Sequence, residues 1–164
     1  MSKSMSTWPT IERLIAEQGA AALVTVAQAQ GSSPREAGAR MVVAPDGTVT
    51  GTIGGGALEW GALAEAQSLM ARRGGLASRL DKALGPDLGQ CCGGRVLLTI
   101  ERFDARDKDT IGKLAEAERA GVLTTVATAG VLQRPCNRER GAGSSRRAYD
   151  AAGQTDGRRS ASDR

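Results

Sequence analysis

The sequence predicts a single compact α/β domain, in which helices pack on a mixed sheet, followed by a disordered tail. Segments with helical spacing of apolar residues alternate with short β-branched runs, and glycine-rich stretches separate them. A length of 164 residues suits one ordinary domain. After Leu132 the chain has no Leu, Ile, Val, Met or Phe, so residues 131–164 lack the apolar surface that folding requires. We therefore expect one folded domain over residues 7–130.

The first half of this domain is predicted to contain one helix and three short strands. The helix has apolar residues three and four positions apart, and the strands are apolar or β-branched runs. The tripeptide Pro-Asp-Gly at 45–47 is typical of the turn in a β-hairpin. In chain order, the expected elements are a helix from its N-cap Thr7 to Gly19, a strand at 22–27, a loop at 31–38, a strand at 40–44 and a strand at 48–50.

The second half is predicted to contain two helices and at least two strands. A helix is expected at 57–73, where Glu59 in the first turn is favourable for the helix dipole. Residues 76–84 are ambiguous and could form a further strand. We expect Trp8 and Trp60 to be packing anchors. The later expected elements are a strand at 95–103, a helix at 107–120 and a strand at 122–129.

Composition excludes several classes of site. The chain has no histidine, which removes Ser-His-Asp and Cys-His catalysis and every histidine-ligated metal site. The net charge is +4, but residues 1–130 carry 14 basic and 14 acidic residues, so the excess comes from the tail and a nucleic-acid partner is not expected. With no apolar run of membrane-spanning length and no export signal, we expect a cytoplasmic protein without a membrane partner. Its three cysteines are then expected to be reduced.

The strongest candidate site is the Cys-Cys segment, which we define as residues 89–95. It places Gln90, Cys91 and Cys92 between glycine residues, with Arg95 nearby. A thiolate in positive surroundings can act as a nucleophile or as a metal ligand. The alternative is that one of the two cysteines is a small buried hydrophobic residue.

Two further glycine-rich motifs suit an anionic ligand. The Ser-Pro-Arg loop, residues 31–35, offers hydroxyl groups and a guanidinium group to an oxyanion. The glycine turn, residues 51–56, precedes a helix and can present backbone N–H groups to a phosphate. Turn formation alone is the alternative explanation for both, and neither a Rossmann fingerprint nor a P-loop is present. The candidate residues in these two motifs are Ser33, Arg35, Gly54, Gly55 and Gly56.

Together, the three motifs resemble those of the XdhC/CoxI family, accessory proteins for xanthine dehydrogenase and related molybdenum hydroxylases. The matching stretches are Gly31-Ser-Ser-Pro-Arg-Glu-Ala-Gly-Ala-Arg-Met41, Gly51-Thr-Ile-Gly-Gly-Gly-Ala-Leu-Glu59 and Leu84-Gly-Pro-Asp-Leu-Gly-Gln-Cys-Cys-Gly-Gly94. The resemblance implies a chaperone, not an enzyme, that binds the molybdenum cofactor (molybdopterin) transiently. It would protect the cofactor while a cysteine desulfurase or sulfurtransferase installs the terminal sulfur, and then help to insert it into the client enzyme.

The resemblance also implies roles for individual residues. The glycine turn and Arg35 would bind the cofactor phosphate, and Gln90 would meet the edge of the pterin. Cys91 is favoured over Cys92 as a soft ligand for molybdenum or as a sulfur relay. Ser33 completes the predicted set of cofactor-binding residues.

The end of the sequence departs from the family pattern. Family members usually continue into a Rossmann-like domain that opens with a strand and a Gly-Ala-Gly-His motif. Here Gly141-Ala-Gly-Ser144 has no apolar strand before it, and arginine replaces lysine throughout the tail. We therefore expect a truncated or frameshifted family member with impaired chaperone activity, for which a homodimer is possible.

Two other functions are alternatives. A thiol-based redox protein using Cys91 and Cys92 is the main one, although the sequence has no CxxC spacing and no histidine to activate a thiol. A nucleic-acid binder acting through the arginine-rich tail ranks last.

Overall fold

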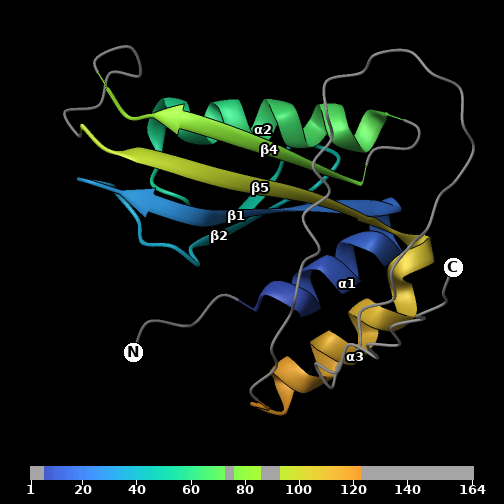
Figure 1. The fold of residues 1–164 in the computed structure, drawn as a ribbon. Helices are drawn as coiled ribbons and strands as arrows, with labels where there is room; N and C mark the ends of the chain where they lie inside the picture. Colours follow the sequence, from blue (N-terminus) through green and yellow to red (C-terminus); the bar gives the residue numbers. More distant parts are fainter. Residues whose placement is uncertain (1–5, 73–75, 86–92, 123–164) are drawn as a thin grey trace, which may run out of the picture.

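Three α-helices, a short 3-10 helix and five strands form the part of the chain that the computed structural model describes, residues 6–72, 76–85 and 93–122 (Figure 1). The expected tail and nearly all of the strand expected at 122–129 lie outside these residues. In chain order the elements are α1 (Thr7–Gln18), β1 (Ala20–Gln30), β2 (Arg40–Val43), β3 (Val49–Gly51), α2 (Gly56–Ala71), β4 (Ala77–Ala83), β5 (Arg95–Asp104), the 3-10 helix (Ala105–Asp107) and α3 (Lys108–Arg119).

The five strands form one sheet in the order β3-β2-β1-β5-β4. All four pairings are antiparallel, so the sheet itself is not mixed in direction, while the predicted α/β class is confirmed. Short loops join β1 to β2 and β2 to β3, and connections of this length produce antiparallel neighbours. Helix α2 carries the chain from the β3 edge to β4 at the opposite edge.

The helices cover both faces of the sheet, with α2 on one face and α1 and α3 on the other (Figure 1). Successive residues of β1 alternate between the two cores, as the pleat of a strand requires. Ala22, Val24 and Val26 pack beneath α2, whereas Ala21 and Leu23 pack against α1 and α3. Both faces of the central strand are therefore buried, which is why its sequence is a continuous apolar run.

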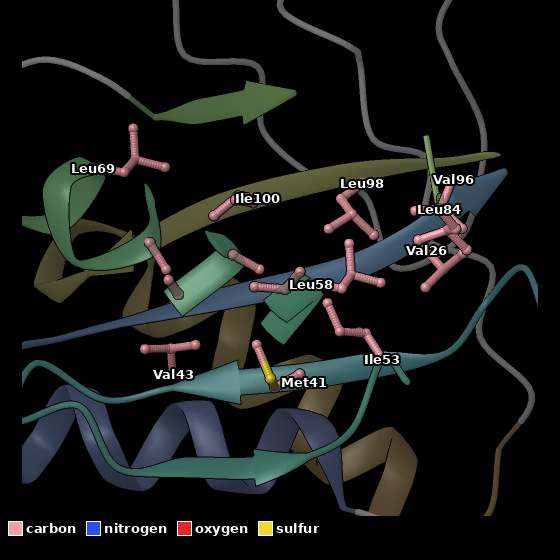
Figure 2. Close-up of a cluster of buried hydrophobic side chains, with 14 residues drawn as sticks. Val26, Met41, Val43, Ile53, Leu58, Leu69, Leu84, Val96, Leu98 and Ile100 are labelled. Atoms are coloured by element: carbon pink, nitrogen blue, oxygen red, sulfur yellow. The ribbon is translucent and has the colours of Figure 1, made fainter. Parts of the chain in front are cut away.

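The larger core lies between α2 and the sheet (Figure 2). Leu98 and Ile100 of β5 are fully buried there, opposite Leu58 and Leu69 of α2. On the other face, the rings of Trp8 and Phe103 meet edge to face, with their centroids 6.0 Å apart. That geometry is a favoured arrangement for aromatic pairs.

The hairpin and the end of the first helix form as the sequence predicts. Gly19 adopts a left-handed conformation and its N–H donates to the Ile15 carbonyl at 3.0 Å, which ends α1. In the turn at 45–47, the Asp46 carboxylate accepts a hydrogen bond from the Thr48 N–H at 2.8 Å. Gly47 there has a φ of 87°. Both signals are local, so neighbouring residues suffice to determine them.

Other expectations require correction. Thr7 is the first residue of α1 and not its N-cap, because the cap comes from another helix: the N–H groups of Thr7 and Trp8 donate to the two carboxylate oxygens of Glu118 in α3, at 2.9 and 2.8 Å. Trp60 is 73% exposed and is not a packing anchor. It lies two residues from both Leu58 and Ala62, which places it on the opposite side of α2 from the core. The ambiguous segment at 76–84 forms strand β4.

Candidate functional site

Two of the three sequence motifs meet, together with the end of the third, at one end of the sheet. The Ser-Pro-Arg loop leaves the end of β1, where Gln30 pairs with Arg95, the first residue of β5. This loop lies between the glycine turn on one side and the end of the Cys-Cys segment on the other. Pro34 and Gly54 are 20 residues apart in sequence and Ser32 and Gly94 are 62 apart, so distant segments are brought into contact around a single loop.

Gly94 provides the contact on the side of the Cys-Cys segment. A Cβ atom at this position would overlap the carbonyl oxygen of Ser32 and lie 2.6 Å from that of Gln30. Both atoms belong to the backbone and cannot move aside by a change of rotamer. The Gly94 carbonyl also accepts a hydrogen bond from the Leu84 N–H at 2.7 Å. Glycine is therefore required at position 94 by close packing of the backbone.

Gly54 provides the contact on the side of the glycine turn. A Cβ atom there would lie only 2.5 Å from Cγ of Pro34, and 3.7 Å from Cγ of Arg35. With a φ of 132°, Gly54 also has a conformation that side chains rarely allow. The proline ring thus rests directly on Gly54, and the stem of Arg35 runs beside it.

The sheet below these loops contains a local irregularity. The register between β1 and β5 shifts between Val26 and Gln28, which places a β-bulge at Ala27. Bulges redirect the end of a strand and are frequent beside functional sites. At this end of the sheet, Val26, Leu84 and Val96 pack together beneath the loops (Figure 2).

The glycine turn binds an anionic group of the protein itself. Oε1 of Glu59 accepts hydrogen bonds from the Thr52 hydroxyl at 2.5 Å and from the N–H groups of Ile53 and Gly55, each at 3.0 Å. Burial raises the pKa of Glu59, but these hydrogen bonds outweigh it and hold the pKa below its ordinary value. The predicted interaction of Glu59 with the start of the helix is thus present. A phosphate that bound the Ile53 and Gly55 N–H groups would have to displace Glu59.

The Ser-Pro-Arg loop presents a cation to solvent. The Ser33 hydroxyl donates to the Arg35 carbonyl at 2.8 Å, which stabilises the turn. Arg35 is exposed, and its guanidinium group has no salt bridge within the described part of the chain. Of the predicted site residues that the structure describes, Arg35 is the one with a charge available to an anionic ligand.

Arg95 is paired with a carboxylate, whereas the sequence suggested a positive charge close to the two cysteines. Its guanidinium group binds the Asp81 carboxylate through two hydrogen bonds, Nε to Oδ1 at 2.6 Å and Nη2 to Oδ2 at 2.9 Å. These bonds hold the pKa of Asp81 below its ordinary value. Because Asp81 neutralises it, Arg95 provides less positive potential to the neighbouring thiols than a free arginine would.

The remaining predicted site residues, Gln90, Cys91 and Cys92, lie outside the described residues. Within the described ranges, no three acidic or cysteine residues cluster in a way that could hold a metal ion. No helix in these ranges is long and apolar enough to cross a membrane.

Two hollows in the described part of the chain are lined by residues outside the three motifs. One is a groove between α1 and α3, lined by Pro9, Thr10 and Lys108 among others. A smaller one lies near Trp8 and Phe103, against the same pair of helices.

Residues 14–79 match the XdhC and CoxI family. Among solved structures, a crystal structure described as a xanthine dehydrogenase from Bacillus halodurans is similar to this chain, with 27% sequence identity and a TM-score of 0.61. The similarity covers 71% of this chain and 36% of the other, so this chain spans just over a third of the length of that protein. No curated protein matches this sequence. The family match includes the Ser-Pro-Arg loop and the glycine turn.

Proposed function

We propose that this chain is a molybdenum cofactor-binding accessory protein, which holds the cofactor during maturation and insertion and does not turn over a substrate. The proposal rests on the way in which the motif segments meet around the Ser-Pro-Arg loop. Gly54 lies in close contact with the ring of Pro34, and Gly94 lies in close contact with the backbone of Ser32. The match of residues 14–79 to the XdhC and CoxI family, and the similarity to the solved structure, support the same role. A site assembled from three separate segments is more specific than any of its motifs alone.

Arg35 is the residue that we assign to the cofactor phosphate. Its guanidinium group is exposed and free of salt bridges within the described residues, and a guanidinium group binds phosphate through paired N–H donors. The N–H groups of Ile53 and Gly55 are already occupied by Glu59, so the glycine turn would contribute through them only after that carboxylate moves. Gly56 remains a candidate at the start of α2.

The two adjacent cysteines supply the soft donors that this ligand needs. Thiolates suit molybdenum and sulfur transfer better than oxygen ligands do. The bound group would contribute a dithiolene-held molybdenum centre. We assign to Cys91 the role of coordinating the molybdenum or relaying the sulfur. We assign to Gln90 a contact with the edge of the pterin. Both residues lie a few positions before Gly94, which packs against the Ser-Pro-Arg loop.

The partners that follow from this role are a cysteine desulfurase or sulfurtransferase and a molybdenum hydroxylase such as xanthine dehydrogenase. A cytoplasmic location accords with these partners. Because this chain spans just over a third of the similar solved protein, we propose cofactor holding for this chain rather than the whole of that protein's activity.

Cofactor retention tests the proposal. The purified chain is mixed with molybdenum cofactor released from a molybdenum enzyme, separated from unbound material, and assayed for pterin fluorescence and metal content. We expect retention by the wild-type chain, and several-fold less by Arg35→Gln and by the double variant Cys91→Ala/Cys92→Ala. Arg13→Gln is the matched control, since Arg13 is an exposed arginine on α1 that pairs with Glu17. No retention by the wild type, or equal retention by all the variants, would refute the proposal.

A further inference from the structure

Strand β4 forms one edge of the sheet, and within the described ranges no strand pairs with its outer side. It extends over seven residues, whereas β3 at the opposite edge has three. All of its residues are at least partly exposed. A long edge strand of this kind presents unpaired backbone N–H and C=O groups that another strand can bind. Of the two edges, β4 is therefore the more available for strand pairing.

The hydrogen bonds that flank β4 establish which of its backbone groups face outward. The Leu84 N–H donates to the Gly94 carbonyl at one end, and the Leu76 carbonyl accepts from a β5 N–H at the other, at 2.7 and 2.8 Å. The register between β4 and β5 is regular between these two points. Because successive residues alternate in direction, the even-numbered residues face β5. The odd-numbered residues, including Arg79 and Asp81, direct their N–H and C=O groups to the free edge.

The charges at these two outward-facing positions are opposite, and they lie symmetrically on either side of Leu80. In an antiparallel pair of β4 strands with a two-fold axis at Leu80, Arg79 lies directly opposite Asp81 of the partner subunit, and the reverse is also true. Ala77 then lies opposite Ala83 of the partner subunit, so every outward-facing residue of the strand has a hydrogen-bonding partner. Opposite charges in directly opposed positions stabilise a strand pair.

The neighbouring registers are unfavourable. A shift by two residues in either direction keeps the backbone hydrogen bonds but places Arg79 opposite its own copy, or Asp81 opposite its own copy. Like charges directly opposed destabilise a strand pair. Lys82, a residue type that often protects sheet edges, lies opposite Ser78 in the favoured register and meets no cation there. The order of the two charges along β4 thus favours the antiparallel register centred on Leu80 and disfavours the registers shifted by two residues.

We propose that this chain forms a homodimer in which the β4 strands of two copies pair antiparallel about a two-fold axis at Leu80, with ion pairs between Arg79 and Asp81 across the interface. The two sheets become one continuous sheet, as in other strand-addition interfaces. Asp81 keeps its bond to Arg95, because a carboxylate has lone pairs for more than two donors. The dimer does not depend on the cofactor function proposed above.

Charge reversal tests this interface. Sedimentation of the full chain over a range of concentrations should give twice the 16.9 kDa of one copy at the upper end. Arg79→Asp alone, or Asp81→Arg alone, opposes like charges and should raise the dimer dissociation constant about tenfold or more. An equimolar mixture of the two variants restores opposite charges and should form a heterodimer. Circular dichroism confirms that each variant is folded.

Hydrogen exchange on the wild-type chain provides a second measurement that needs no substitution. The amide protons of Arg79 and Asp81 should gain protection as the concentration rises, whereas those of Leu80 and Lys82, which face β5, should be protected throughout. A wild type that stays monomeric, single variants that dimerise like the wild type, or a mixture that does not associate would each overturn the proposal. Protection of the Arg79 and Asp81 amides that does not change with concentration would also overturn the proposal. It would mean that a segment of the same chain, and not a second copy, binds the outer edge of β4.

Discussion

The contact between Gly94 and the Ser-Pro-Arg loop gives the sharpest test of how the motifs are assembled. In Gly94→Ala the new methyl group would overlap the Ser32 carbonyl and lie 2.6 Å from the Gln30 carbonyl, closer than real Cβ contacts come. To relieve this overlap, either the loop or the start of β5 has to shift. Overpacking of this kind costs about 1–3 kcal/mol of unfolding free energy.

Gly93→Ala is the matched control. Gly93 is the adjacent residue, and within the described part of the chain no atom lies within 4 Å of where its new methyl group would be. Both substitutions reduce the conformational entropy of the unfolded chain by a similar amount, about 0.4–1 kcal/mol. The difference between the two variants therefore isolates the cost of the backbone overlap.

Urea denaturation followed by circular dichroism measures that difference. With a slope of about 2 kcal/mol per molar urea, the transition midpoint of Gly94→Ala should lie roughly 0.5–1.5 M below that of Gly93→Ala. Equal midpoints would refute the close approach of the two segments, and with it the assembly of the motifs around one loop.

Two further predictions concern carboxylates that accept backbone hydrogen bonds. Glu118→Ala removes the cap of α1 and leaves the buried Thr7 N–H unpaired, so the unfolding free energy should fall by about 0.5–2 kcal/mol, whereas Glu116→Ala, at an exposed position on the same helix, should change it little. Thermal denaturation of the two variants checks this, and equal melting temperatures would contradict the cap. The pKa of Glu59 is lower in the folded chain than its ordinary value of 4.5. The ionised carboxylate therefore stabilises the fold at pH values above 4.5, and this stabilisation is lost as the pH falls through the folded-state pKa. Urea denaturation at several pH values should therefore show the stability advantage of the wild type over Glu59→Gln shrinking in acid, and a constant advantage would contradict the assignment.

The sequence nominated the residues of the candidate site, but it did not predict how the motifs that contain them are arranged in space. Glycine and serine motifs mark backbone turns wherever they occur, and their order along the chain pointed to the family. The contact of Pro34 with Gly54, and of the loop backbone with Gly94, depends on β1 and β5 lying side by side. No pattern within any one motif contains that information. The occupation of the glycine turn by Glu59 is an intermediate case, because Glu59 is only six residues from Ile53.

The sequence by itself determined the features that arise between near neighbours in the chain: the helix end at Gly19, the hairpin turn at 45–47, and the alternation of helices and strands. These depend on φ preferences and on hydrogen bonds that span a few residues, so the local sequence suffices. Tertiary structure alone decided the strand order, the formation of β4, the capping of α1 by Glu118 and the exposure of Trp60. Each of these depends on which distant surfaces pack together, and that is decided by burial summed over the whole domain.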